Sequence, residues 1–139
     1  MNVQGLVKSP SVFGPRETMD RLAAGVSERG MAVLARIDHA AAAATAGLEL
    51  RPTEVLIFGN PSSGTHLMQS VQTIGIDLPL KALVWQDDQD RTWLAWNDPA
   101  WLATRHGVSI EPDGVLAGMT DALAALTRRA TTRDMGESS

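Results

Sequence analysis

The chain has 139 residues, 44% of them hydrophobic and 20% charged, values typical of one globular domain that can bury its own core. A net charge of -4 argues against a nucleic-acid partner, and the absence of cysteine excludes disulfides, thiol catalysis and thiolate metal sites. No signal segment is present, and no apolar run approaches the roughly 18 residues that span a bilayer, so we expect a cytoplasmic protein with no membrane partner.

The first half of the chain alternates predicted strands and helices. In order they are a strand near residues 3–10, a helix over 16–29, a strand over 31–37, a short alanine-rich helix over 40–46 and a strand over 53–58. Met19, Leu22 and Val26 recur at the three- and four-residue spacing of one helix face. The run from Val55 to Phe58 does not alternate, which predicts a strand that is buried on both faces.

The second half predicts a hairpin flanked by helices. Its elements are a helix over 65–74, a strand over 80–85, a polar loop over 86–90, a strand over 91–96, a helix from Asp98 to His106 and a helix over 113–129. Trp93 and Leu94 must point to opposite faces of their strand, with Trp96 on the face of Leu94. Two strands that follow one another without a helix rule out a purely parallel sheet. We therefore predict an α+β fold with a mixed, largely antiparallel sheet and helices on one face, as one domain over 1–130 followed by a disordered tail over 131–139.

Polar residues stand at three corners where a predicted strand gives way to a helix. They are Asp38 and His39; Gly59, Asn60 and Pro61, with His66 in the helix that follows; and Asn97 and Asp98. Helix N-termini present free N–H groups and a partial positive charge, so such corners favour anionic ligands. If the sheet brings the three corners to one edge, they line a polar cleft. Each corner also has a structural explanation, Asp38 and Asp98 as N-caps and the Gly59 corner as a turn.

Two histidines are candidates for acid–base chemistry. His39 or His66 could act as a general base beside Asp38 or Asp77, since only histidine titrates close to neutral pH without perturbation. His106 is interpreted as a cation at a helix C-terminus. The same groups could hold a divalent metal, but no ligand spacing supports such a site, and no nucleophile-elbow spacing accompanies the serines. We expect no metal and no cofactor.

The four tryptophans are close together in the sequence. They are Trp85, Trp93, Trp96 and Trp101. One interpretation is core and sheet packing; the alternative is a hydrophobic surface for a second subunit, because tryptophan is enriched in interface anchors. The hairpin and the alanine-rich helix make a homodimer the predicted assembly.

Five short motifs occur in order along the chain. They are Ala35-Arg-Ile-Asp-His-Ala40, Gly47-Leu-Glu-Leu-Arg-Pro52, Leu56-Ile-Phe-Gly-Asn-Pro61, Asp77-Leu-Pro-Leu80 and Asn97-Asp-Pro99. Together they resemble the family called domain of unknown function 302, from Phe13 to the end of the final predicted helix. The resemblance implies a small bacterial or archaeal α+β domain, often a dimer, with a β-α-β(4)-α arrangement similar to that of the TATA-binding protein. It implies no reaction, and a related fold does not carry over nucleic-acid binding.

Three functions from different classes follow from these residues. The favoured one is a dimeric module that binds a small polar or anionic ligand at the three corners. The second is an enzyme with His39 or His66 as general base. The third is a protein-interaction module that uses the tryptophan-rich hairpin.

Overall fold

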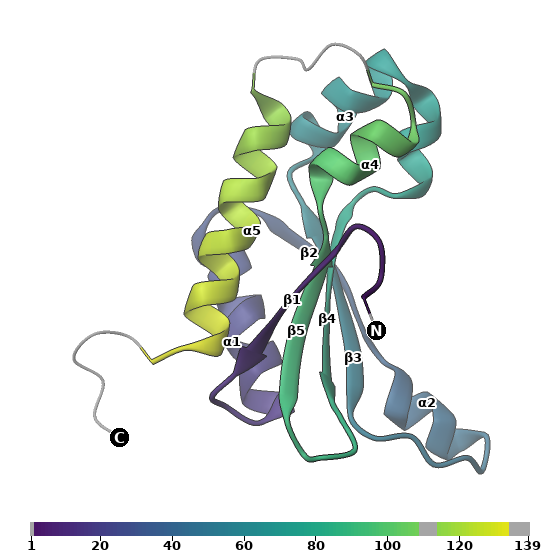
Figure 1. Cartoon of the computed structure of the whole chain (residues 1–139), viewed down its shortest axis with the longest axis vertical. Coiled ribbons are helices and arrows are strands. Elements are labelled where there is room, and N and C mark those ends of the chain that lie inside the picture. Colours follow the sequence, from purple (N-terminus) through teal and green to yellow (C-terminus); the bar gives the residue numbers. More distant parts are fainter. Residues whose placement is uncertain (1, 109–113, 134–139) are drawn as a thin grey trace.

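The computed structural model describes residues 2–108 and 114–133 of the chain. Its elements follow in the order β1 (Leu6–Ser11), α1 (Pro15–Glu28), β2 (Ala32–Asp38), α2 (His39–Thr45), β3 (Thr53–Gly59), α3 (Pro61–Ser70), the 3-10 helix η1 (Gln72–Ile76), β4 (Leu80–Gln86), β5 (Thr92–Asn97), α4 (Pro99–Arg105) and α5 (Val115–Thr131) (Figure 1). The predicted order of strands and helices is confirmed.

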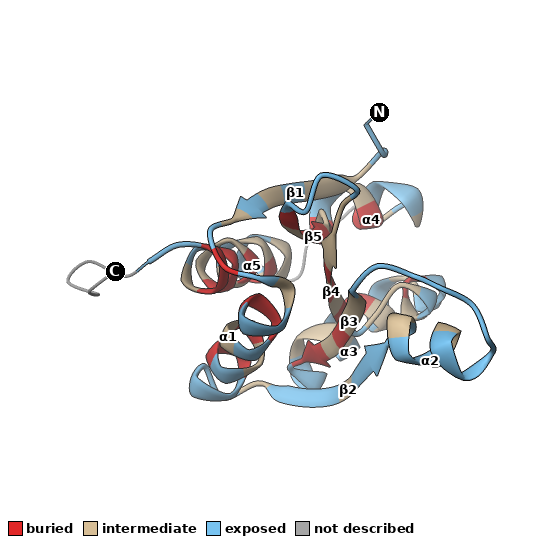
Figure 2. Ribbon diagram, turned by 90° about the horizontal axis from the view of Figure 1, so that it is seen from below, coloured by how far each residue is buried: buried red, intermediate tan, exposed pale blue. Residues whose placement is uncertain are grey.

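The strands form one five-stranded sheet in the order β1-β5-β4-β3-β2, and every neighbouring pair is antiparallel. Helices α1 and α5 lie side by side on one face of this sheet, while α2 lies on the other side (Figure 2). This arrangement confirms the predicted α+β fold. Strands β3 and β5 run in the same direction because each is antiparallel to β4, whereas β2 runs the opposite way.

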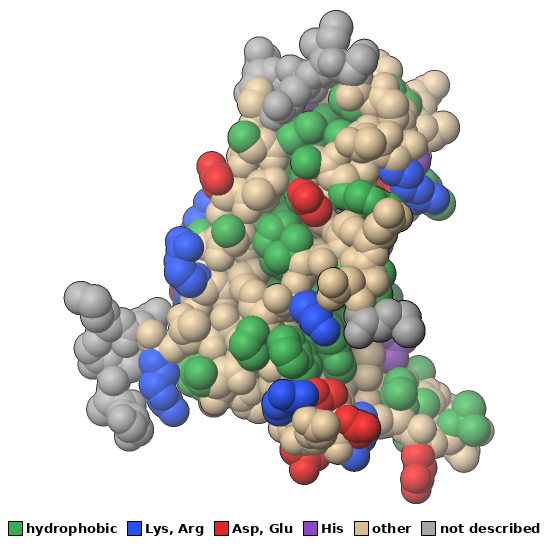
Figure 3. All heavy atoms as spheres, viewed as in Figure 1, with side chains coloured by type: hydrophobic (Ala, Val, Ile, Leu, Met, Phe, Trp, Pro, Cys, Tyr) green, Lys and Arg blue, Asp and Glu red, His purple; other side chains and the backbone are tan. Residues whose placement is uncertain are grey.

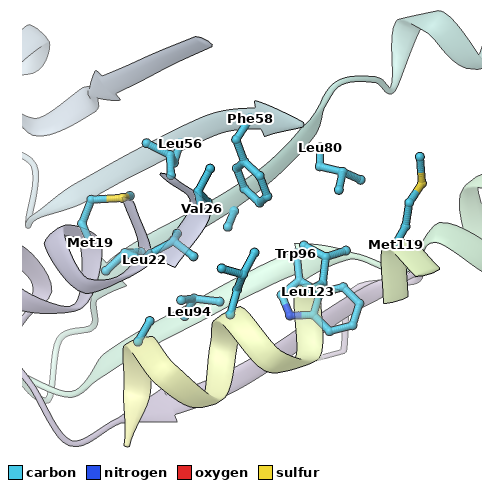
Figure 4. Packing of buried hydrophobic residues seen from close by; sticks show 14 of the residues in the cluster. Met19, Leu22, Val26, Leu56, Phe58, Leu80, Leu94, Trp96, Met119 and Leu123 are labelled. Atoms are coloured by element: carbon cyan, nitrogen blue, oxygen red, sulfur yellow. The ribbon is translucent and has the colours of Figure 1, made fainter. Parts of the chain in front are cut away.

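The core lies between the sheet and the pair α1 and α5. Its side chains converge from both layers in Figure 4: Met19, Leu22 and Val26 from α1, Leu56 and Phe58 from β3, Leu80 from β4, Leu94 and Trp96 from β5, and Met119 and Leu123 from α5. The predicted alternation of β5 is confirmed, because Leu94 and Trp96 are buried together. The indole N–H of Trp96 donates to Thr127 Oγ1 at 2.9 Å, so the one polar atom of this ring is satisfied inside the core.

The opposite face of the sheet is only half covered. Val55 and Ile57 are half-buried, whereas Leu56 and Phe58 on the same strand are fully buried. The expectation that this strand is buried on both faces is therefore wrong, since α1 and α5 cover one face alone. Ile37, which pairs with Val55 across β2 and β3, is 40% exposed.

The boundaries of helix α3 differ most from the predicted ones. Helix α3 begins at Pro61 rather than at Thr65, because Asn60 Oδ1 accepts the N–H of Ser62 at 2.9 Å and caps the helix where a turn was predicted. The helix ends at Ser70, since Val71 is extended with φ -143°, and η1 continues to Ile76.

The C-terminal boundary also moves. Helix α5 continues to Thr131, which is buried and whose carbonyl accepts the N–H of Val12 at 2.9 Å, so the tail predicted to begin at 131 starts too early. The predicted helix start at Asp113 and the remainder of the predicted tail, 134–139, lie outside the described residues.

Candidate functional site

The three polar corners do not meet at one edge of the sheet. Strands β3 and β5 end at the same edge, which places Asn60 and Asp98 at the α3 and α4 end of the molecule. Strand β2 is antiparallel to β3, so Asp38 and His39 lie at the opposite end, beside α2 (Figure 1). The hypothesis of a single cleft lined by all three corners is wrong, and antiparallel pairing is the physical reason.

Each corner caps a helix, as predicted for Asp38 and Asp98 and in place of the turn predicted at Asn60. Asp38 Oδ1 accepts the N–H of Ala41 at 2.9 Å, and Asp98 Oδ1 accepts the N–H of Ala100 at 3.0 Å. Asn60 does the same for α3. Capping satisfies N–H groups that have no partner inside the helix, which is sufficient reason for these side chains to be present.

A cavity of about 510 Å³ opens at the edge where β3 ends. Its apolar wall is formed by Met31 and Leu34 from the start of β2, Met68 from α3, Leu78 and Leu80 around the start of β4, and Met119 from α5. Leu80 and Met119 also form one end of the core, so the cavity continues the core outward (Figure 4).

Small residues on α5 leave this space open. Gly118 and Ala122, one helical turn apart, both line the cavity, and a Cβ added at Gly118 would meet nothing within 4 Å. Glycine in a helix interior costs about 1 kcal/mol relative to alanine. The helix therefore gives up stability at the position where a larger side chain would occupy the cavity.

The rim of the cavity is polar. It is formed by Arg29 at the end of α1 and by Asn60, Ser63 and Thr65 around the start of α3. Thr65 Oγ1 already donates to the carbonyl of Pro61 at 2.7 Å, whereas the hydroxyl of Ser63 has no hydrogen bond to another described residue. Of the predicted site residues, Gly59, Asn60 and Pro61 line this cavity, and the others do not.

Asp38 lines a separate hollow of about 370 Å³ at the α2 end, together with Arg16 and Glu54. Both carboxylates there already have partners. Asp38 caps α2, and Glu54 receives a hydrogen bond from Arg36 Nε at 2.7 Å. Neither carboxylate of this hollow is therefore a free group for a ligand.

A buried histidine was not among the predicted site residues. His106 Nε2 lies 2.6 Å from Asp77 Oδ2, Arg105 Nη1 lies 2.7 Å from the same oxygen, and Thr73 Oγ1 lies 2.9 Å from His106 Nδ1. The His106 side chain is 8% exposed. This cluster ties η1 to α4, so the interpretation of His106 as a simple helix-end cation missed its partner, which is 29 positions away.

The charge of Asp77 is set by two opposing effects. Burial raises the pKa of this carboxyl, but the hydrogen bonds from His106 and Arg105 outweigh it, and the pKa lies below its ordinary value. Asp77 is therefore a carboxylate at neutral pH. His39 and His66, the predicted general bases, are exposed and make no hydrogen bond or ion pair with any residue in 2–108 or 114–133. The structure thus pairs Asp77 with His106 and not with either predicted base.

The tryptophans fall into different environments. Trp96 is in the core, while Trp85 and Trp93 lie stacked on the half-covered face of the sheet, with ring centroids 6.4 Å apart. The indole N–H of Trp93 donates to Asp87 Oδ2 at 2.9 Å. Acidic and basic side chains mix at the tip of this hairpin, at the bottom of Figure 3, where Arg51 pairs with Asp90.

The part of the chain that the structure describes has neither a cluster of metal ligands nor a helix that could span a membrane. Over 2–108 and 114–133, no three histidine, aspartate or glutamate side chains gather in a group that could hold a metal ion. In the same ranges, every helix is too short or too polar to cross a bilayer.

Comparison with known proteins gives relatives of two kinds. The chain is 47% identical over 126 residues to "Fluoride-specific ion channel FluC 1" of Brucella suis biovar 1, an alignment that covers 91% of this chain and 50% of the relative. It is equally similar to "Fluoride-specific ion channel FluC 2" of Brucella melitensis biotype 1, of which it covers 47%. The chain thus spans about half the length of the curated relatives it matches.

A solved structure shows the same fold. The crystal structure of the uncharacterized conserved protein DUF302 from Bacillus stearothermophilus superimposes with a TM-score of 0.79 at 22% identity, covering 92% of this chain and 99% of that one. Residues 7–126 match the family described as Domain of unknown function DUF302. The resemblance seen in the sequence motifs is confirmed: the chain belongs to the DUF302 family.

Proposed function

We propose that the protein is a small-molecule-binding module whose ligand occupies the cavity between α3 and α5. The cavity itself carries this proposal. Its volume of about 510 Å³ falls within the roughly 300–1,000 Å³ of typical ligand pockets, and its apolar wall with a few polar groups at the rim is the usual composition of such pockets. The side chains of Ser63 and Asn60 supply hydrogen-bonding groups that orient a ligand.

The lining favours a ligand with an apolar part over a purely polar one. Met31, Met68 and Met119 contribute flexible, polarizable side chains, which adapt to apolar ligands of different shapes. Burial of apolar surface supplies the free energy of binding, and the rim supplies orientation. His106 and Asp77 do not line this cavity, which favours binding over acid–base catalysis at this site.

A substitution at Gly118 tests this function. Gly118→Phe fills the cavity from α5, where space is available, and Gly118→Ala is the matched control, since it changes helix propensity without filling the space. A panel of octanoate, 1-octanol and indole is expected to raise the melting temperature of the wild type and of Gly118→Ala, but not of Gly118→Phe. Equal shifts in Gly118→Phe would place the binding site elsewhere and refute the proposal.

We further propose that the module is a homodimer. Helix α2 has seven residues, buries none of them and projects from the rest of the chain (Figure 1). Isolated helices shorter than about 12 residues are marginal in water, so α2 needs a packing partner. Leu48 and Leu50, which follow it, are 66% and 49% exposed.

The half-covered face of the sheet is the surface that a second copy would contact. Helix α2 lies on the same side as this face, opposite α1 and α5 (Figure 2). Leu83, Trp85 and Trp93 are half-buried there. A two-fold dimer in which each α2 packs on the partner's sheet face would bury both surfaces reciprocally.

Light scattering coupled to size exclusion tests the dimer. The wild type is expected to elute as a dimer, and Leu48→Glu as a monomer, because a charge in an apolar interface is costly. Ile76→Glu is the matched control, since Ile76 is 74% exposed but lies in η1 at the other end of the molecule. A monomeric wild type, or dissociation by the control alone, would contradict the proposal.

A second candidate function rests on the names of the relatives. Their alignment with this chain covers about half their length, which supports a role for the domain as an accessory part of a fluoride-specific ion channel. We propose that the domain modulates such a channel. Deletion of the matching segment from the Brucella suis relative is expected to change fluoride efflux from proteoliposomes, whereas unchanged efflux would refute this role.

A further inference from the structure

One charged side chain stands at the rim of the cavity. Arg29 is the only ionised group among the described residues that line it, is itself exposed, and has no ion pair with another described residue. Several other arginines form ion pairs with an aspartate or a glutamate: Arg36, Arg51, Arg91, Arg105 and Arg129. No described acidic side chain lines the cavity, so its mouth carries a positive charge.

The start of α3 adds to this positive potential. Helix α3 has ten residues, and its first turn, with Ser63, borders the cavity. The partial positive charge of a helix N-terminus stabilises an anion nearby. A single arginine with one helix end suits a monoanion such as a carboxylate, for which a guanidinium offers two parallel hydrogen bonds.

The interior of the cavity suits a flexible aliphatic chain. Behind the rim the wall is formed by thioether and branched aliphatic side chains, including Met31, Met68, Leu78 and Met119. Methionine side chains are flexible and can repack around an unbranched aliphatic chain, so the cavity wall does not need one fixed shape. No described lining residue behind the rim offers a charged partner that would require a second polar group on the ligand.

We propose that the cavity binds a free medium-chain carboxylate, with its aliphatic chain against the methionine and leucine wall and its carboxylate at Arg29. This inference rests on the proposed binding function of the same cavity and adds the chemical class of the ligand. Each methylene that enters the cavity contributes about 0.8 kcal/mol, so the affinity rises about fourfold per methylene until the cavity is full.

Isothermal titration with three probes of similar chain length tests the proposal on the full chain. The probes are octanoate, 1-octanol and octyltrimethylammonium, and the variants are Arg29→Gln and Gly118→Phe. Octanoate is expected to bind the wild type about fivefold more tightly than 1-octanol, a modest preference because the rim is open to solvent. Arg29→Gln should remove this preference. A series from hexanoate to decanoate should gain about fourfold per methylene.

The outcomes separate this inference from the function on which it rests. If 1-octanol or octyltrimethylammonium binds the wild type as tightly as octanoate, the carboxylate assignment is overturned and the binding function stands. If none of the three probes binds, both are overturned. Binding of octanoate that survives Gly118→Phe refutes the placement of the chain in this cavity. A preference for octanoate that persists in Arg29→Gln refutes the role of Arg29.

Discussion

The two ends of the sheet start their helices in the same way and hold them differently. At one end Asn60 caps α3, and at the other Asp38 caps α2, each with a side-chain oxygen on a backbone N–H. Helix α3 then buries Leu67 in the core, whereas α2 buries nothing. A cap thus determines where a helix begins, while packing determines whether the chain itself stabilises that helix.

The largest expected difference in stability between the two ends comes from replacing one leucine by alanine at each end. Leu67→Ala removes a side chain that is 1% exposed and should lower the free energy of unfolding by about 2–5 kcal/mol. Leu48→Ala, at a side chain that is 66% exposed in a single chain, should change the concentration-independent part of this free energy by less than about 0.5 kcal/mol. Urea denaturation measures both values. A concentration-independent loss at Leu48 as large as that at Leu67 would mean that the α2 end is packed by its own chain.

The next largest effect on stability is expected at the cluster of Asp77, Arg105 and His106, at the α3 end of the sheet. Asp77→Asn removes the carboxylate that His106 and Arg105 share and should lower the free energy of unfolding by about 1–3 kcal/mol at pH 7. The neutral asparagine has nearly the same volume, so lost packing does not account for the change. If the wild type and Asp77→Asn have the same free energy of unfolding, the cluster does not contribute to stability.

The same carboxylate predicts a dependence on pH. Because the folded-state pKa of Asp77 lies below its ordinary value of about 4, the stabilisation is complete above pH 4 and is lost as the pH falls below it. The difference in unfolding free energy between wild type and Asp77→Asn should therefore shrink as the pH falls from 4 towards 3. A difference that grows on acidification would reverse the sign and contradict the assignment.

Removal of the N-caps should produce a smaller difference in stability between the two ends of the sheet. Asn60→Ala should cost about 1 kcal/mol of unfolding free energy, the usual value for an N-cap, because α3 is part of the packed domain. Asp38→Ala should lower the helix content seen by circular dichroism with little change in global stability, since α2 buries no residue. Equal losses of global stability would show that both helices belong to one cooperative unit.

The smallest effect is expected at the hairpin tip near α2. The indole N–H of Trp93, followed by the backbone N–H of Arg91, lowers the pKa of Asp87 to about 2. A carbon-detected NMR titration should find this midpoint, and Trp93→Phe should move it back towards about 4. Because the folded-state pKa is depressed, the contribution to stability is present above pH 4 and is lost as the pH falls towards 2. An unchanged midpoint in Trp93→Phe would assign the shift to the backbone donors alone.

Much of the fold could be predicted because its signals are local. Asp38 and Asp98 cap helices as predicted, and the alternation around Leu94 assigned the buried face of β5 correctly. The hydrogen bonds of caps and the face of a strand depend on residues within about four positions, which the sequence displays directly. The boundary of α3 was missed because an Asn60-Pro61 pair is typical of both a turn and a helix start.

The candidate site was predicted only in part. The Gly59 corner does border the cavity, but Asp38 was assigned to the same site although antiparallel pairing carries it to the other end of the sheet. Nothing in the sequence signals Arg29 or Gly118, since one is an ordinary surface residue type and the other an ordinary helix glycine. They become site residues only because α1 and α5 bring them to the same cavity.

By itself, the sequence determined the order of strands and helices, the caps Asp38 and Asp98, and the membership in the DUF302 family. The tertiary structure alone decided which strand ends share an edge, that Asp77 meets His106 across 29 positions, and that one face of the sheet remains half covered. The division has a physical reason. Local structure follows from interactions between neighbours in the chain, whereas cavities and clusters form between elements whose contact depends on the pairing order of the strands.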